Sequence, residues 1–376
     1  MKTETRITRR LGASLALALA LAGAINVHAD SGAYVQRNLI SDGFSAAEHQ
    51  PPDSNLVNAW GIAFGPTSPV WVADNGMGVS TLYDGDGNPK SLVVAIPSPS
   101  DPTGGGTPTG IVFNGAASFS VSGTDADGTA VSGPSHFLFA TEDGFIVGWP
   151  GGSQAFIGVD NSVNNPVGTG AIYKGLALLA LNADGTGQQL YATDFHNARV
   201  DVFDSSFAPV TTLPAGAFTD PGLPAGYAPF GIQAIGPHIF VTYAKQVAGS
   251  NDEAHGQGLG VVDVYDANGT LLSRVATHGL LNAPWGIAMA PAGFGKFSNN
   301  LLVGNFGDGS INAFDMKNFT PQGPLHGQDG HVLHIDGLWG IAFGNDHMDQ
   351  PSTTLFFAAG PDDEQHGLYG RIDVAQ

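Results

Sequence analysis

One short pattern recurs six times along the chain and constrains its fold more than any other feature. A bulky or polar residue precedes a Gly, and the Gly is followed by a run of apolar residues, as in Trp285-Gly286-Ile287-Ala288-Met289. Apolar, β-rich runs bounded by Gly, Pro, Asn and Asp are typical of strands and turns. The six repeat glycines are separated by 49, 65, 56, 55 and 54 residues and are Gly61, Gly110, Gly175, Gly231, Gly286 and Gly340.

Further strand-like runs follow each copy of the pattern. A second apolar run stands at residues 301–305, and a third run with a V/I-x-V/A-F/Y-D pattern stands at residues 311–315. A weaker fourth run occurs in several repeats, for example at residues 271–276. Six units of about four strands predict an all-β fold, a six-bladed β-propeller of four-stranded antiparallel blades. The repeat Gly fits this fold, because first strands crowd the central axis, where a side chain would collide.

The two ends of the predicted ring complement one another. The chain ends after residues 371–374, the third strand of the sixth blade, whereas residues 34–40 form a spare strand before the first blade. We therefore expect residues 34–40 to complete blade six and close the ring, which hides sheet edges that would otherwise pair with other chains. Residues 116–135 are an insertion in blade two, which we expect to form a surface hairpin or a mobile loop. The single repeat register predicts one domain over residues 30–376.

The first 29 residues have the composition of a signal peptide. Lys2, Arg6, Arg9 and Arg10 form a basic segment, residues 11–25 are apolar, and Val27-His28-Ala29 is an acceptable cleavage site. We expect export to the periplasm or the extracellular space, with no membrane anchor after cleavage. The chain has no Cys, which excludes disulfides and a lipid-anchored Cys.

Charge limits the partners that the mature chain can have. Without residues 1–29, the chain carries 9 Lys and Arg against 32 Asp and Glu, a net charge of −23. Nucleic acids and anionic membrane surfaces are therefore excluded as partners. We expect a soluble, acidic, monomeric protein that concentrates cations at its surface.

Three of the five tryptophans precede a repeat Gly. They are Trp60, Trp285 and Trp339. Antiparallel strand order places them at the same end of the ring as the loops that follow each second strand. The interpretation we favour is that the indoles wedge neighbouring blades together, because bulky aromatic side chains usually pack. The alternative is that they line the mouth of a ligand site.

The loops after the second strands are rich in oxygen ligands. Four of these residues could converge on one Ca²⁺, a hard ion that takes six to eight oxygens. They are Asp74, Glu142, Asp194 and Asn305. The alternative is that each side chain caps its own turn by bonding to free backbone N–H groups.

A [N/D]-D-E-x-H-G motif occurs twice, at residues 251–256 and 362–367, both after second strands. A Glu and a His two residues apart can act as a base and its orienting group, or as metal ligands. The motif could equally be a local lock, with carboxylates and His bonding the loop backbone. Duplication favours the lock, while the shared face keeps a single site possible. The candidate ligand-binding residues are Asp252, Glu253, His255, Asp363, Glu364 and His366.

The patterns P-x-G-I-A, L-x-V-x-N/D and I-x-x-F-D resemble those of NHL-repeat propellers. The chain also resembles an uncharacterised family of secreted bacterial propellers and, distantly, the calcium-dependent lactonase and phosphotriesterase propellers. The repeats without a complete catalytic constellation predict a secreted binding or scaffold protein for a small molecule, glycan or protein. The lactonase resemblance implies, as the alternative, a calcium-dependent hydrolase with Ca²⁺ as cofactor. No catalytic residue is predicted.

Overall fold

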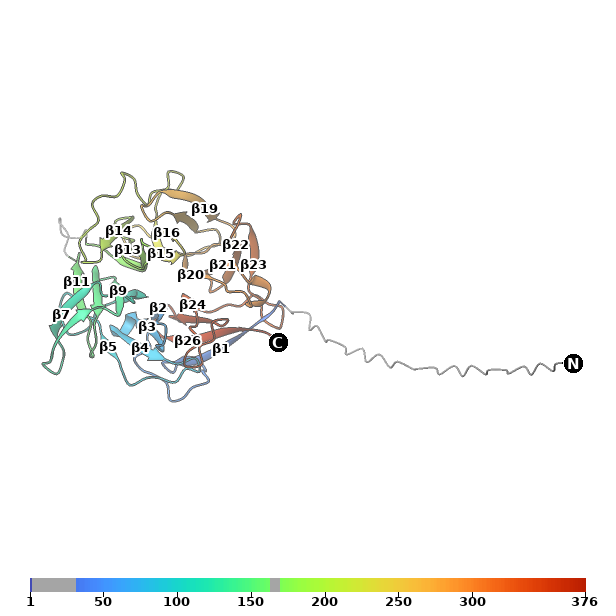
Figure 1. The fold of residues 1–376 in the computed structure, drawn as a ribbon, viewed down its shortest axis with the longest axis horizontal. Coiled ribbons are helices and arrows are strands. Elements are labelled where there is room, and N and C mark those ends of the chain that lie inside the picture. Colours follow the sequence, from blue (N-terminus) through green and yellow to red (C-terminus); the bar gives the residue numbers. More distant parts are fainter. Residues whose placement is uncertain (2–31, 163–169) are drawn as a thin grey trace.

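The structure is a six-bladed β-propeller, which confirms the predicted fold class. The computed structural model describes Met1, residues 32–162 and residues 170–376. Figure 1 shows small antiparallel sheets arranged in a ring around a common centre. Apart from Met1, the predicted signal peptide lies outside the described residues. Within the described residues, no helix has both the length and the apolar character needed to cross a membrane.

Each blade begins with its innermost strand and runs outward. Blade one consists of β2 (Ala59–Phe64), β3 (Val70–Asp74), β4 (Val79–Tyr83) and β5 (Val94–Ala95), with η1 (Asn75–Met77) after β3. Blade two consists of β6 (Pro108–Phe113), β9 (Phe137–Thr141), β10 (Phe145–Trp149) and β11 (Phe156–Asp160). The predicted hairpin of blade two is present as β7 (Ser120–Thr124) and β8 (Ala130–Pro134).

Blades three to five repeat the plan with local differences. Blade three has three regular strands, β12 (Tyr173–Ala180), β13 (Gln188–Asp194) and β14 (Arg199–Asp204). Blade four consists of β15 (Tyr227–Ile235), β16 (His238–Gln246), β18 (Val261–Tyr265) and β19 (Leu271–Thr277), with the short β17 (Glu253–Ala254) paired to β16. Blade five consists of β20 (Pro284–Met289), β21 (Asn300–Asn305), β22 (Ile311–Asp315) and β23 (Pro321–Pro324), with η2 (Gly295–Phe297) before β21.

Blade six is closed by the N-terminal strand, as predicted. It contains β24 (Leu338–Phe343), β25 (Leu355–Ala359), β26 (Leu368–Val374) and, on the outer edge, β1 (Tyr34–Ser41). Strand β1 runs antiparallel to β26, with Tyr34 opposite Val374. The buried Tyr34 hydroxyl donates a hydrogen bond to the carbonyl of Phe294 in blade five (3.1 Å). The closing strand therefore also fastens blade six to its neighbour.

The repeat glycines form a ring of close contacts around the axis. A Cβ added to Gly61 would lie 2.5 Å from the carbonyl oxygen of Thr109 in blade two, and one added to Gly340 would lie 2.5 Å from the carbonyl of Trp60 in blade one. The other four repeat glycines meet the first strand of the next blade in the same way, at 2.0–3.0 Å. Since real Cβ atoms do not approach so closely, Gly is required where the inner strands converge.

Every first strand carries a register irregularity around its repeat Gly. In β2 the pairing with β3 shifts between Ala59 and Ile62, and the other five first strands shift at the corresponding place. A β-bulge bends its strand and changes the direction of a side chain. Here the bulge turns the residue before the repeat Gly out of the regular alternation of the strand. In four blades this residue is aromatic, and the four side chains meet at the axis; they are Trp60, Phe230, Trp285 and Trp339.

Candidate functional site

The axial residues build an aromatic cluster that closes the centre of the ring. Its members, called the aromatic plug below, are Trp60, Phe195, Phe230, Trp285, Phe306 and Trp339. Trp339 lies at its centre, with Trp60 stacked on it at 3.5 Å between ring centroids and Phe306 stacked at 3.9 Å. Trp285 meets both other indoles edge-on, at 6.0 Å from Trp60 and 5.6 Å from Trp339. Such offset and edge-to-face pairs stabilise beyond the area they bury.

The plug explains the role of the three repeat tryptophans. All three are buried. They pack, as the interpretation we favoured requires, and they pack against one another at the axis. Trp285 donates its indole N–H to the backbone carbonyl of Lys174 at 2.9 Å. Trp60 and Trp339 also form the floor of a pocket, whereas Trp285 lies on the other side of the plug, beside the glycine ring.

All six blades contribute side chains to the pocket above the plug. Its volume is about 280 Å³, and we call it the acidic pocket. It is lined by Asn58, Trp60, Asn75, Glu142, Lys174, Asp252, Glu253, His255, Phe306, Trp339, Asp363 and Glu364. Most polar members come from the segments that follow second strands, whereas Asn58 precedes a first strand and Lys174 lies at the start of one. The propeller therefore gathers at one point residues that are far apart in the sequence.

A chain of hydrogen bonds orders one side of this pocket. The Trp60 indole N–H donates to Asn58 Oδ1 (2.9 Å), and Asn58 Nδ2 donates to Asn75 Oδ1 (3.3 Å). Asn75 Nδ2 donates to Glu142 Oε2 (2.9 Å), and Lys174 Nζ donates to Glu142 Oε1 (2.6 Å). Both oxygens of Glu142 are thus engaged. The network links blades one, two and three and leaves Glu142 little capacity for a ligand.

Lys174 is the buried cation at the centre of the site. The residue is 3% exposed, and its Nζ lies 5.0 Å from the centroid of the Trp60 ring. Burial lowers the pKa of Lys174, but the carboxylates of Glu142, Glu253 and Glu364 oppose this effect and raise the pKa above its usual value. The ammonium therefore stays charged because acidic groups surround it.

The two D-E-x-H-G loops converge on this pocket through different local structures. In blade four, Glu253 lies in β17, and His255 Nε2 is 3.5 Å from Glu253 Oε1. In blade six, Asp362, Asp363 and Glu364 have φ values of 56°, 51° and 65°. Three successive non-glycine residues in the left-handed region are strained, and such strain often accompanies function. Glu253 and Glu364 both line the pocket, so the copies belong to one site.

Glu364 is the most perturbed acid in the acidic pocket. Burial raises its pKa to about 7, although the charge of Lys174 opposes the shift. Its Oε1 is buried and has no hydrogen-bond partner among the described residues. The indole N–H of Trp339 is likewise buried without a partner in the described part of the chain. A buried polar atom that lacks a partner costs free energy, so both atoms mark places where a ligand or water would be stabilised.

The histidines of the two motif copies have different surroundings. The hydrogen bond with Glu253 raises the pKa of His255, and the His255 ring contacts Phe306 edge-on at 5.0 Å. His366 instead lies outside the acidic pocket. Its Nδ1 is 2.6 Å from Asp42 Oδ2, and its ring stacks on Phe44 at 4.1 Å. His366 thus joins its loop to the segment around residues 42–44 rather than bonding its own loop backbone, while His255 lines the pocket.

The four predicted calcium ligands are not brought together. Asp74 accepts hydrogen bonds from the backbone and hydroxyl of Thr81, and Asp194 accepts from Asn197. Asn305 donates to the Leu280 carbonyl (2.7 Å), while Glu142 pairs with Lys174. Among residues 32–162 and 170–376, no group of three or more His, Asp or Glu side chains is arranged to hold a metal ion. Asp74 and Asp194 accept backbone N–H bonds within their own blades, as the turn interpretation requires, whereas Asn305 joins its loop to residues 280 and 282.

Sequence reasoning missed Lys174 and Asn58 as members of the site, and it named Asn75 only as one of the polar residues that follow the second strands. Lys174 had a visible signal, because it precedes the repeat Gly of blade three, where Trp60, Trp285 and Trp339 stand in their blades. A Lys at a position that is aromatic in four of the six blades indicates a buried cation with an acidic partner. Asn58 and Asn75 gave no comparable signal, since their role depends on the geometry between blades.

The chain belongs to the family that includes two mimivirus proteins. It is 34% identical over 340 residues to "Uncharacterized protein R648" of Acanthamoeba polyphaga mimivirus, which spans 89% of this chain and 78% of that protein. It is 32% identical over 341 residues to "Uncharacterized protein L690" of the same virus, with 89% and 84% covered. No family model matches the chain.

Solved propeller structures show the same architecture at low sequence identity. Virginiamycin B lyase from Staphylococcus aureus superposes with a TM-score of 0.50 and 13% identity, covering 91% of this chain and all of the lyase. The soluble aldose sugar dehydrogenase from Escherichia coli, solved in the apo form, gives 0.52 and 14%, again with 91% and 100% covered. At these identities the likeness shows the propeller fold alone. The resemblance to NHL-repeat and lactonase propellers stays a prediction.

Proposed function

We propose that this protein is an exported propeller that binds a small organic cation in the acidic pocket. The observation that carries the proposal is the unpartnered, buried Oε1 of Glu364, which lies in a pocket where acids outnumber bases. Lys174 neutralises Glu142, with which it shares a 2.6 Å contact, and His255 lies 3.5 Å from Glu253. Among the described lining residues, Asp252, Asp363 and Glu364 have no cation in direct contact. A ligand that brings a positive charge would compensate them.

The pocket geometry supports an organic ligand rather than a bare metal ion. Its volume of about 280 Å³ exceeds what a single ion fills and lies just below the usual range of about 300–1,000 Å³ for drug-sized ligands. Its open acceptors come from Glu253 in blade four and Glu364 in blade six, and the ordered network lies on the other side. An ammonium group with several N–H donors suits acceptors that approach from two directions.

Matched probes test the charge requirement directly. Ethanolamine and its neutral isostere 1-propanol, together with putrescine and choline, would be titrated into the mature protein by calorimetry. We expect saturable binding of at least one of the cations and none of the isostere. Glu364→Gln and Glu253→Gln should each weaken binding at least tenfold. His366→Gln is the matched control, because His366 belongs to the same motif but lies outside the pocket.

The pH dependence provides a second readout. A cation favours the ionised form of Glu364, whose pKa is about 7 in the empty pocket. Binding should therefore tighten as the pH rises from 6 to 8 and should release protons. Failure of every cation to bind, or equal affinity in Glu364→Gln, would reject the proposal.

The alternative function, calcium-dependent hydrolysis, is tested in the same titration. It requires Ca²⁺ to bind through Asp74, Glu142, Asp194 and Asn305, the set predicted from sequence. If Ca²⁺ binds and Asp194→Asn abolishes its binding, the calcium alternative replaces the organic-cation proposal. If Ca²⁺ binding depends on Glu253 and Glu364 instead, the acidic pocket is an inorganic cation site.

A further inference from the structure

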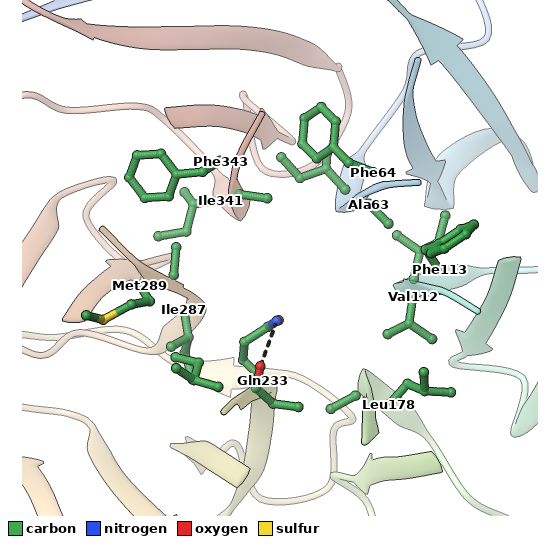
Figure 2. A pocket seen from close by; sticks show the side chains of 17 residues that line it. Ala63, Phe64, Val112, Phe113, Leu178, Gln233, Ile287, Met289, Ile341 and Phe343 are labelled. Atoms are coloured by element: carbon green, nitrogen blue, oxygen red, sulfur yellow. Dashed lines mark hydrogen bonds between the residues drawn. The ribbon is translucent and has the colours of Figure 1, made fainter. Parts of the chain in front are cut away.

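The opposite end of the ring contains a second cavity of different character. Its volume is about 480 Å³, and it is lined by the C-terminal halves of the six first strands. Figure 2 shows the side chains of these strands around an open centre, with Phe64, Phe113 and Phe343 on three blades and Met289 on a fourth. We call it the apolar cavity.

The aromatic plug separates this cavity from the acidic pocket. The two share no lining residue. A small space of about 40 Å³ at the level of the repeat glycines continues the apolar cavity inward, and Trp285 lines this space. The apolar cavity is therefore a blind recess that opens on one face of the ring, with an indole at its inner end.

Gln233 is the only polar side chain among the seventeen described residues that line the apolar cavity. It is exposed, and Figure 2 shows it reaching toward the centre. Its amide makes one long contact, 3.5 Å from Nε2 to the carbonyl of Ala234. A contact of that length is a weak hydrogen bond, so the amide keeps both donor and acceptor capacity.

None of the described residues that line the cavity carries a charged side chain, although the chain without residues 1–29 has a net charge of −23. Small-molecule sites in proteins typically have about 300–1,000 Å³ of space, apolar walls and a few polar groups that orient the ligand. An ionised ligand would lose hydration here without gaining an opposite charge. A neutral apolar ligand would instead remove from water the part of the half-buried Phe and Met side chains that still faces the solvent.

We propose that the apolar cavity is a second ligand site, which takes a neutral, mainly apolar small molecule whose single hydroxyl or carbonyl group bonds to Gln233. This site is independent of the cation site proposed above. The two sites lie on opposite sides of the plug, so the loss of one leaves the other intact.

Three probes of equal chain length test the ligand class. 1-Octanol, octanoate and octylammonium would be titrated into the mature protein by calorimetry. We expect saturable binding of 1-octanol, with octanoate and octylammonium at least tenfold weaker. Gln233→Leu should weaken 1-octanol binding about three- to tenfold, the effect of one lost hydrogen bond. Glu364→Gln, in the acidic pocket, should leave it unchanged.

Blocking variants test the location. Gln233→Trp fills the cavity from blade four, where Figure 2 shows the side chain reaching toward the centre, and Gln233→Arg, which places a charge there, serves if the first variant fails to fold. Either folded variant should lose 1-octanol binding. In the parent protein, 8-bromo-1-octanol should quench tryptophan fluorescence, and Trp285→Phe should reduce that quenching. Equal affinity for octanol and octanoate, or octanol binding that survives a folded blocking variant, would overturn the proposal.

Discussion

Replacing Glu364 by Gln should stabilise the protein, and the gain should grow with pH. The pKa of Glu364 rises from 4.5 to about 7 in the folded state, chiefly through burial. Between these values the folded state holds the proton more tightly than the unfolded state, so stability falls as the pH rises through this window. At about 1.4 kcal/mol for each unit of pKa, the full deficit above pH 7 is about 3 kcal/mol.

Gln mimics the protonated carboxyl group and does not titrate. The stability difference between Glu364→Gln and the parent should therefore increase by about 2–3 kcal/mol between pH 5 and pH 8. With an unfolding entropy of about 2.1 cal/mol/K per residue, this corresponds to about 3–4 °C in Tm for a chain of about 340 ordered residues. Calorimetric melts and urea titrations at both pH values would measure it.

A control must remove a carboxylate that does not titrate in this range. Asp184 lies in an exposed turn of blade three, and hydrogen bonds from Thr186 lower its pKa. Asp184→Asn should shift stability by a similar amount at pH 5 and pH 8. If the stability difference between Glu364→Gln and the parent were also the same at pH 5 and pH 8, the carboxyl group of Glu364 would not be protonated near neutral pH. The raised pKa that we assign to Glu364 in the acidic pocket would then be wrong.

Three further perturbations test the architecture around the site. Deletion of residues 34–40 removes the partner of β26 and should cause aggregation or a large fall in Tm, as measured by light scattering during a melt. Trp339→Ala empties the centre of the plug and should cost about 3–5 kcal/mol in urea unfolding, whereas a loss under about 1 kcal/mol would contradict the packing role. Lys174→Met leaves Glu142 without its cation and should destabilise by about 3–5 kcal/mol at pH 8 but less at pH 5, because protonation relieves the unpaired acids.

The fold was predictable because it depends on features that repeat. The six repeat glycines, beginning with Gly61 and Gly110, show how many first strands meet at the axis. Each must be Gly because a Cβ would collide with the backbone of the next blade's first strand. Ring closure followed from simple matching of a spare strand at residues 34–40 with a blade that ended one strand short. The irregular outer edge of blade three was not predicted, because it reflects local chain geometry rather than the repeat.

The candidate site was predictable only in part. The duplicated motif identified Glu253 and Glu364, and the antiparallel order placed both on the correct face. Their convergence depends on loop conformation, since one Glu lies in a short strand and the other in a left-handed turn. Asp74 and Asp194 share the same face but turn back into their own blades, where they accept local hydrogen bonds. Sequence patterns report the face of a residue better than the direction of its side chain.

The way the ring closes also determines when the chain can finish folding. Strand β1 precedes every other described strand, and its partner β26 follows them all. Residues 34–41 are among the first described residues to be synthesised, but they cannot pair until β26 exists. The outer edge of blade six therefore stays uncovered until the chain has been synthesised as far as residue 374. Folding that depends on such a distant contact is slow, since a long loop must close before any compensating contact forms. The completed ring should then unfold as a unit. After a protease cleaves one blade, the pairing of β1 with β26 would still join the two ends of the chain.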